Sequence, residues 1–386
     1  MKNRGLAPVF IFAILDVSFI GVFLAAFIKD HSASAFAISA ILVTKNISRI
    51  ITDIPLGIFA DKFDVRVTFL FARICRIASV ALLVFPSTKT FIVSMILYGM
   101  SMSGFYGKVD SYLYRYLNNT NQKERFTKVI SAYYGMCDIA MVFTGLVASF
   151  IFSNFNYNGL IITTFITTLA SIFVIPFITK NVTEPEKLRK NKPIGVWRNA
   201  MANIKSSPAL LYIAATIGIG NAIVWQSHSV TSILLLNFGI APQIVALVPS
   251  ATAVLMSAGY ASVYFIFKNL NLKVALFIFL AAVVALFASS FEYTYATLMA
   301  FGAVIFVFPI TNSIIEKKLE NFATPSARST ITSISTFASS TLNITLTLLF
   351  GAMSSFTSHH NALCVILTIV TLFLTFVCLR LYQLTK

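Results

Sequence analysis

Long apolar stretches alternate with short polar ones along the whole chain. Each apolar stretch has about 20 residues or more, the length that a helix needs to cross a bilayer. Twelve such segments are predicted, at about 8–28, 35–59, 67–86, 91–113, 127–152, 158–179, 209–237, 242–267, 272–290, 294–315, 327–353 and 361–382. The pattern predicts an all-α polytopic membrane protein, with twelve transmembrane helices in two six-helix bundles.

A polar stretch rich in lysine and arginine separates the sixth and seventh segments. It divides the chain into an N-terminal bundle, a cytoplasmic linker and a C-terminal bundle, at residues 1–179, 180–208 and 209–386. A weak internal repeat supports this division. Gly57 and Gly259 lie at similar depths in the two halves, and each is followed nine residues later by a basic residue. The repeat predicts pseudo-two-fold symmetry.

The composition agrees with a membrane protein. Hydrophobic residues make up 58% of 386, charged residues only 11%, and the mean hydropathy is +0.84. A soluble core cannot bury so large an apolar fraction. The four cysteines, Cys75, Cys137, Cys364 and Cys378, all lie in apolar segments without a metal-binding or disulfide spacing. We therefore expect no metal and no cofactor.

The net charge of +16 is explained by the position of the basic residues. Of the 29 lysines and arginines, two lie in loops predicted to be outside, Lys29 and Lys89. Five lie within segments, and the other 22 lie in inner loops and termini. This asymmetry places both termini in the cytoplasm, by the positive-inside rule. It predicts a bacterial inner (plasma) membrane protein whose surroundings are the lipid bilayer, and it removes nucleic acid as a partner.

A charged turn joins the second and third segments in the stretch Asp53-Ile-Pro-Leu-Gly-Ile-Phe-Ala-Asp-Lys-Phe-Asp-Val-Arg66. The stretch resembles the loop signature of the major facilitator superfamily, acid-x-Pro-x-Gly-x-x-Ala-Asp-(Arg/Lys)-x-Gly-(Arg/Lys)-(Arg/Lys). The matching residues are Asp53, Pro55, Gly57, Ala60, Asp61, Lys62 and Arg66. Asp64 replaces the family glycine and Val65 a basic residue. The resemblance implies a gating loop formed by Asp53, Gly57, Asp61, Lys62 and Arg66.

A second pattern lies in the fourth segment, Ser103-Gly104 followed by Tyr114-Arg-Tyr-Leu117. It resembles the bacterial drug- and metabolite-efflux-like branch of the same superfamily, with Arg115 in place of the family aspartate. Two other motifs of that branch are absent, since Met95 stands at an arginine position and no proline lies near Gly145. Efflux is therefore implied only by the resemblance.

Charged residues inside the first six segments are the main candidates for function. A charge at mid-bilayer costs about 2.5–3.5 kcal/mol on insertion scales, so such residues are expected in a polar network or a water-filled cavity. Substrate binding or proton coupling is expected from Asp16, Lys45, Arg49, Lys108, Asp110 and Asp138. Lys45, Arg49 and Asp53 are spaced i, i+4, i+8 and form one stripe. The alternatives are a fixed structural ion-pair network, and snorkelling of Arg73 and Arg76 to the cytoplasmic end.

The second half offers polar rather than charged candidates. They lie in the seventh segment and are Asn221, Trp225, Gln226 and His228. Asn221, Trp225 and His228 share one helix face by their spacing. A single histidine here is either a packed polar residue or a proton carrier.

These features predict a secondary active transporter that works by alternating access, and not an enzyme. Proton coupling is favoured because Asp16, Asp110 and Asp138 can titrate beside basic partners. The basic stripe favours a small anionic solute, and the efflux-like resemblance an amphiphilic metabolite or drug. A monomer is expected. The alternatives are a non-transporting sensor or receptor of the same fold, and a membrane-embedded lipid-modifying enzyme using His359-His360.

Overall fold

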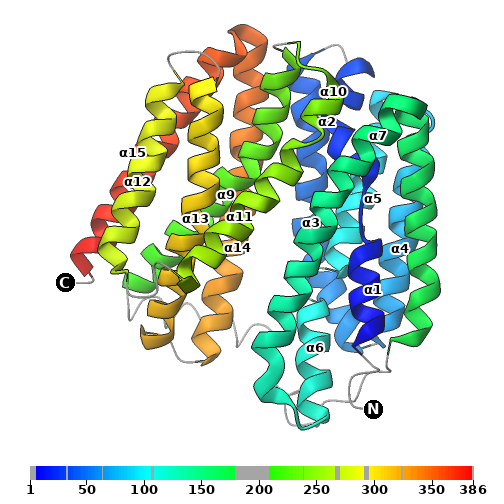
Figure 1. Ribbon diagram of the computed structural model, residues 1–386, viewed down its shortest axis with the longest axis horizontal. Coiled ribbons are helices and arrows are strands. Elements are labelled where there is room, and N and C mark those ends of the chain that lie inside the picture. Colours follow the sequence, from blue (N-terminus) through cyan, green and yellow to red (C-terminus); the bar gives the residue numbers. More distant parts are fainter. Residues whose placement is uncertain are drawn as a thin grey trace. The chain divides into compact units, whose positions relative to one another are not determined.

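The computed structural model describes residues 6–31, 34–62, 64–105, 108–178, 208–237, 239–265, 270–290, 295–322 and 325–384. Every regular element in these ranges is a helix (Figure 1). The chain divides into two compact units, the first made of residues 1–185 and 232–253 and the second of residues 186–231 and 254–386. Nearly all of the predicted linker lies outside the described residues, so its boundaries stay a prediction.

The first unit contains the six predicted N-terminal segments. Its helices are α1 (Ala7–Leu15), α2 (Phe19–His31), α3 (Ala35–Lys62), α4 (Val65–Leu82), α5 (Thr88–Phe105), α6 (Lys108–Asn119), α7 (Phe126–Val174) and α10 (Pro242–Val245), with 3-10 turns η1 (Lys123–Arg125) and η2 (Ile175–Phe177). The fifth and sixth segments together form α7. They meet at Asn156, whose φ of 54° and ψ of −157° interrupt the helical backbone. Asparagine tolerates positive φ better than most residues.

The first predicted segment is not one helix but two. Residues 16–18 lie between α1 and α2 in non-helical backbone (Figure 1). Side chains replace part of the lost helical hydrogen bonding, because Ser18 Oγ accepts from the Gly21 N–H at 3.1 Å and Thr164 Oγ1 accepts from the Ile20 N–H at 3.1 Å. A break inside an apolar segment needs such partners, since lipid offers none.

Helices α3 and α5 approach each other closely through small residues. A Cβ added at Gly99 would collide with the backbone oxygen of Lys45, so only glycine fits there. One turn further, Ser103 Oγ donates to the Arg49 backbone oxygen at 2.8 Å. Small residues and hydroxyls are the usual means by which membrane helices pack. Ser103, one of the residues of the efflux-like pattern, therefore has a packing role here.

Aromatic rings form the centre of the apolar core of the first unit. The rings of Phe12, Phe69 and Phe105 contact one another, with centroids 4.8–5.4 Å apart.

Residues 232–253 join this unit through α7. Ser250 Oγ donates to the Val142 backbone oxygen at 2.9 Å, and a Cβ at Gly145 would collide with Ser250.

The second unit contains the remaining helices. They are α9 (Pro208–Asn237), α11 (Val248–Phe265), α12 (Leu272–Ser289), α13 (Tyr295–Phe322), α14 (Pro325–Phe356) and α15 (His359–Leu384), of which the end of α9 and the start of α11 belong to the first unit. Helix α12 packs beside α13 and α15, and α14 packs beside α15. Pro249 lies in the first turn of α11, where proline fits without a break.

Seven stretches of the described chain are long and apolar enough to cross a membrane. They are Ala7–His31, Lys128–Phe177, Pro242–Val263, Leu272–Ser289, Tyr295–Ile315, Phe337–Phe356 and His359–Gln383. The stretch Lys128–Phe177 contains the reversal at Asn156 and so holds two predicted segments. Helices α3 and α4 are not among the seven, and both carry several charged residues.

Candidate functional site

The break in the first segment is joined to α4 by an ion pair. Arg73 Nη1 donates to Asp16 Oδ1, and the guanidinium carbon lies 4.1 Å from the ring centroid of Phe12 and 5.1 Å from that of Phe105. Arg73 is 2% exposed and Asp16 27% by side chain. The prediction that Arg73 snorkels to the cytoplasmic end is therefore wrong. The arginine reaches into the core of its own unit and its Nε and Nη2 are buried without a hydrogen-bond partner among the described residues.

Arg76 is also buried, and its contact is aromatic. Its guanidinium carbon lies 3.7 Å from the centroid of the Tyr98 ring, and Lys45 Nζ lies 5.5 Å from the same centroid. Arg49 and Arg76 both lie within Coulombic reach of Lys45. Within the described part of the chain, neither Lys45 nor Arg76 has a carboxylate oxygen within 4.0 Å. We call Lys45, Arg49, Arg76 and Tyr98 the Tyr98 cluster.

Asp53 is shared between two cations. Its Oδ2 lies 4.0 Å from Arg49 Nε, one helical turn away, and its Oδ1 lies 3.9 Å from Lys108 Nζ. The i, i+4 spacing of Arg49 and Asp53 thus brings them together as expected. Asp110 faces elsewhere, because Tyr134 donates its hydroxyl to both carboxylate oxygens at 2.8 and 2.9 Å. Lys108 and Asp110 therefore point to different helices.

The other candidates are less well placed by the structure. Asp138 is half-buried in α7, and its role in substrate binding or proton coupling stays a prediction. Asn221 is half-buried in α9. The side chains of Trp225, Gln226 and His228 lie outside the described residues.

The gating loop is described in part. The side chains of Asp61 and Lys62 and the surroundings of Gly57 lie outside what the structure describes, so the gating role of the loop stays a prediction. Asp64 is the N-cap of α4, with its Oδ1 accepting from the Arg66 N–H at 3.0 Å and its Oδ2 lying 3.5 Å from Arg66 Nε. This gives a local reason for the departure from the family glycine. The signal was readable, since aspartate directly before an apolar run is a common helix start.

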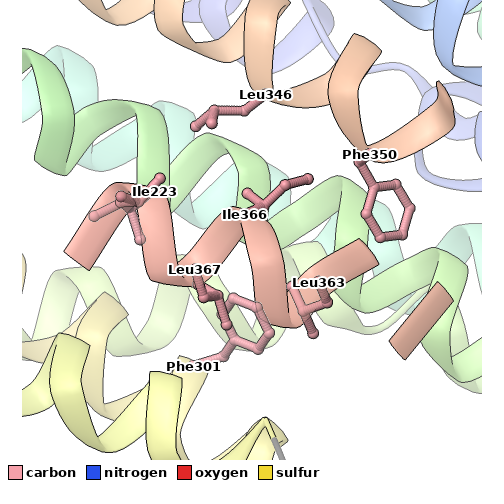
Figure 2. Close-up of a pocket in the computed structure, with 8 residues that line it drawn as sticks. Ile223, Phe301, Leu346, Phe350, Leu363, Ile366 and Leu367 are labelled. Carbon is pink, nitrogen blue, oxygen red and sulfur yellow. The ribbon is translucent and has the colours of Figure 1, made fainter. Parts of the chain in front are cut away.

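The second unit contains an apolar pocket, shown in Figure 2. Its lining residues are Ile223, Phe301, Leu346, Phe350, Leu363, Ile366, Leu367 and Val370. The cavity is small, about 20 Å³, and has room for about one water. Such a small space with a fully apolar lining is a packing defect rather than a solute site.

His359 and His360, the pair considered for an enzyme, make contacts with different residues. The His359 ring stacks on Phe350 with centroids 6.0 Å apart, and His360 Nε2 lies 3.7 Å from Cys364 Sγ. No group of three metal-ligating side chains occurs among the described residues. These contacts give no support to a catalytic histidine cluster.

The fold and the charged side chains inside its apolar segments define a multi-pass membrane protein of the transporter type. The chain matches the Major Facilitator Superfamily over residues 6–347, and it belongs to that family. The family confirms the expected all-α fold of the polytopic class. No curated protein matches the chain.

Solved structures of transporters share the fold over nearly the whole chain. The D323A mutant of the nucleoside transporter NupG matches with a TM-score of 0.76 at 13% identity, covering 99% of this chain and 100% of that one. An inward-facing, unoccupied bacterial homologue of the human lysosomal transporter Spinster gives 0.70 at 14% identity, covering 99% and 96%. A D-xylose–proton symporter gives 0.67 at 14% identity, covering 97% and 95%. At these identities the likeness concerns the fold.

Proposed function

We propose that the chain is a secondary active transporter that moves a small anionic solute across the membrane by alternating access, coupled to protons. The observation that carries the proposal is the position of Lys45, a basic side chain on α3 with no carboxylate oxygen within 4.0 Å among the described residues. A cation held in an apolar bundle without a carboxylate beside it attracts an anion, and an anionic solute supplies that charge.

Proton coupling rests on Asp16 and Arg73. The carboxylate is partly exposed, whereas its arginine partner is buried at the break in the first segment. A proton that reaches Asp16 removes the charge that holds Arg73, so protonation and the geometry of the break are linked. Discontinuous helices with polar groups at the break are a recurring feature of transporter sites. The fold shared with a proton symporter agrees with this proposal.

An amphiphilic metabolite or drug is the second candidate substrate, favoured by the efflux-like pattern at residues 103–117. The proposal includes cytoplasmic termini and a bacterial inner membrane, both supported by the distribution of basic residues. We also propose that the transporter is a monomer.

The test uses purified protein in liposomes that contain a pH-sensitive dye. Pools of mono-, di- and tricarboxylates and phosphate esters are added outside, with a parallel set of cationic and neutral amphiphiles. We expect one anionic pool to change the internal pH, and Asp16→Asn to abolish the change in pH. A response confined to cationic or neutral amphiphiles would favour the second candidate. Flux of an anion without any pH change, equal in Asp16→Asn, would refute proton coupling.

A further inference from the structure

The Tyr98 cluster places two basic side chains, Lys45 and Arg76, beside one aromatic ring, with Arg49 one helical turn from Lys45. Lys45 and Arg49 come from α3, Arg76 from α4 and Tyr98 from α5. Arg76 is 6% exposed, and its guanidinium lies against the ring at 3.7 Å. Lys45 Nζ lies over the same ring at 5.5 Å. The cations are brought together by helix packing, since α3 and α5 touch where Gly99 meets the backbone of Lys45.

Two members of this cluster have no carboxylate beside them in the described protein. Neither Lys45 nor Arg76 has a carboxylate oxygen within 4.0 Å among the described residues. The face of an aromatic ring attracts a cation but carries no net charge. The ring of Tyr98 therefore holds the two side chains in place without neutralising them. Two like charges held this close together repel each other, and an anion bound between them offsets that repulsion.

We propose that the Tyr98 cluster is the binding site for the anionic group of the solute, a carboxylate or a phosphate. This inference rests on the proposed function and adds Arg76 and Tyr98 to it. A guanidinium lying on a ring keeps its N–H edge free to form two parallel hydrogen bonds to such a group. Lys45 supplies a second positive charge as a point donor, and Arg49 links the site to Asp53.

Anion binding can be measured without transport. Purified, delipidated protein in neutral detergent is unfolded by heat in sodium citrate, glutamate or phosphate, with sodium chloride at equal ionic strength as the reference. We expect at least one of these anions to raise the Tm above that in chloride. The rise should be lost in Arg76→Gln and in Lys45→Gln. It should weaken in Arg76→Lys, where loss of the fork lowers the apparent affinity about ten- to a hundred-fold.

A matched control lies in the second unit, where Lys273 Nζ lies 4.7 Å over the ring of Tyr382. Lys273→Gln removes one cation from one tyrosine ring, as Lys45→Gln does, and it should keep the full anion effect. An equal rise of Tm in wild type, Arg76→Gln and Lys45→Gln would overturn the proposal, and so would no rise in wild type. Where Arg76→Gln fails to fold, Lys45→Gln and Arg76→Lys decide.

A lipid phosphate could reach the same cluster, and a separate arm distinguishes it from a solute. The same proteins are heated in mixed micelles with phosphatidylglycerol or with neutral phosphatidylcholine. An Arg76-dependent rise with phosphatidylglycerol but none with the soluble anions would overturn the assignment to a solute. The proposed transport function and the proposed anion site can fail separately. If the protein binds the anion but does not transport it, liposomes would show no flux while the anion effect on Tm remained. Failure of the site alone would leave anion flux intact in Arg76→Gln.

Discussion

Arg73 of α4 donates a hydrogen bond to Asp16 at the break between α1 and α2, across 57 residues of sequence. Arg73 is almost completely buried, and Asp16 is not. The pair thus fixes the first broken segment to a neighbouring helix. It gives a buried arginine the charged partner that lipid cannot provide.

Removing one partner of this pair should cost more than removing both. Asp16→Asn alone should lower the free energy of unfolding by about 3–5 kcal/mol, because it leaves the buried Arg73 unpaired. Arg73→Gln should cost less, because the Asp16 that it leaves is partly exposed. The double variant should recover part of the loss. Thermal unfolding in detergent measures it, and purely additive losses would contradict the pairing.

The close approach at Gly99 predicts a difference between two glycine substitutions. Gly99→Ala should destabilise by about 1–3 kcal/mol, since its Cβ meets the Lys45 backbone oxygen, which cannot move away freely. Gly135→Ala is the control, because a Cβ there meets nothing within 4 Å. It should stabilise α7 by about 0.5–1 kcal/mol. Equal Tm values for the two variants would contradict the packing of α3 against α5.

The cap at Asp64 predicts a graded response. Asp64→Ala should lower the free energy of unfolding by about 1 kcal/mol, whereas Asp64→Gly, which restores the family residue, should lose only a few tenths from the cap. Asn271→Ala serves as the reference, since Asn271 caps α12 by accepting from the Lys273 N–H at 3.2 Å. An Asp64→Gly variant as unstable as Asp64→Ala would show that the ion pair with Arg66 matters more than the cap.

Arg49 and Asp138 are predicted to belong to one coupled network. Arg49→Ala and Asp138→Ala should each lose transport or expression, with partial recovery in the double variant, because an unpaired buried charge is costlier than none. Transport in liposomes and yield after purification are measured for all four proteins. If the losses simply add, Asp138 acts independently of Arg49.

The topology is tested by reporter fusions. Fusions after Asn156 and His360 should report the outside, and fusions after Asp64, Lys192 and Lys386 the inside, because the basic residues concentrate in the inner loops. An external signal at Lys192 would contradict the two-bundle organisation.

The helical segments were predictable because apolar length is a strong signal in a bilayer protein. The break at residues 16–18 was not, since it depends on Thr164, a side chain far away in sequence. The interpretation of Arg73 and Arg76 failed for a similar reason. Their distance from a helix end favoured snorkelling, but Asp16 and Tyr98 lie on other helices, and only packing shows that they are neighbours.

In the candidate site, too, contacts within one helix were predictable and contacts between helices were not. The i, i+4 spacing of Arg49 and Asp53 was enough to predict that they share one helix face, where they form an ion pair. The hydrogen bonds from Tyr134 to Asp110 connect α7 to α6, and no spacing pattern in the sequence predicts them. The N-cap role of Asp64 was predictable from the sequence, because aspartate directly before an apolar run is a common helix start.

The contact of α3 with α5 at Gly99 has a consequence for how this chain can diverge. With no room for a methyl group between the two backbones, these helices cannot slide to suit a new solute. In the binding site proposed above, a descendant with another specificity would exchange side chains at Lys45, Arg49 or Tyr98 and keep the glycine. Laboratory selection for new substrates should therefore recover substitutions at those three positions and leave Gly99 untouched.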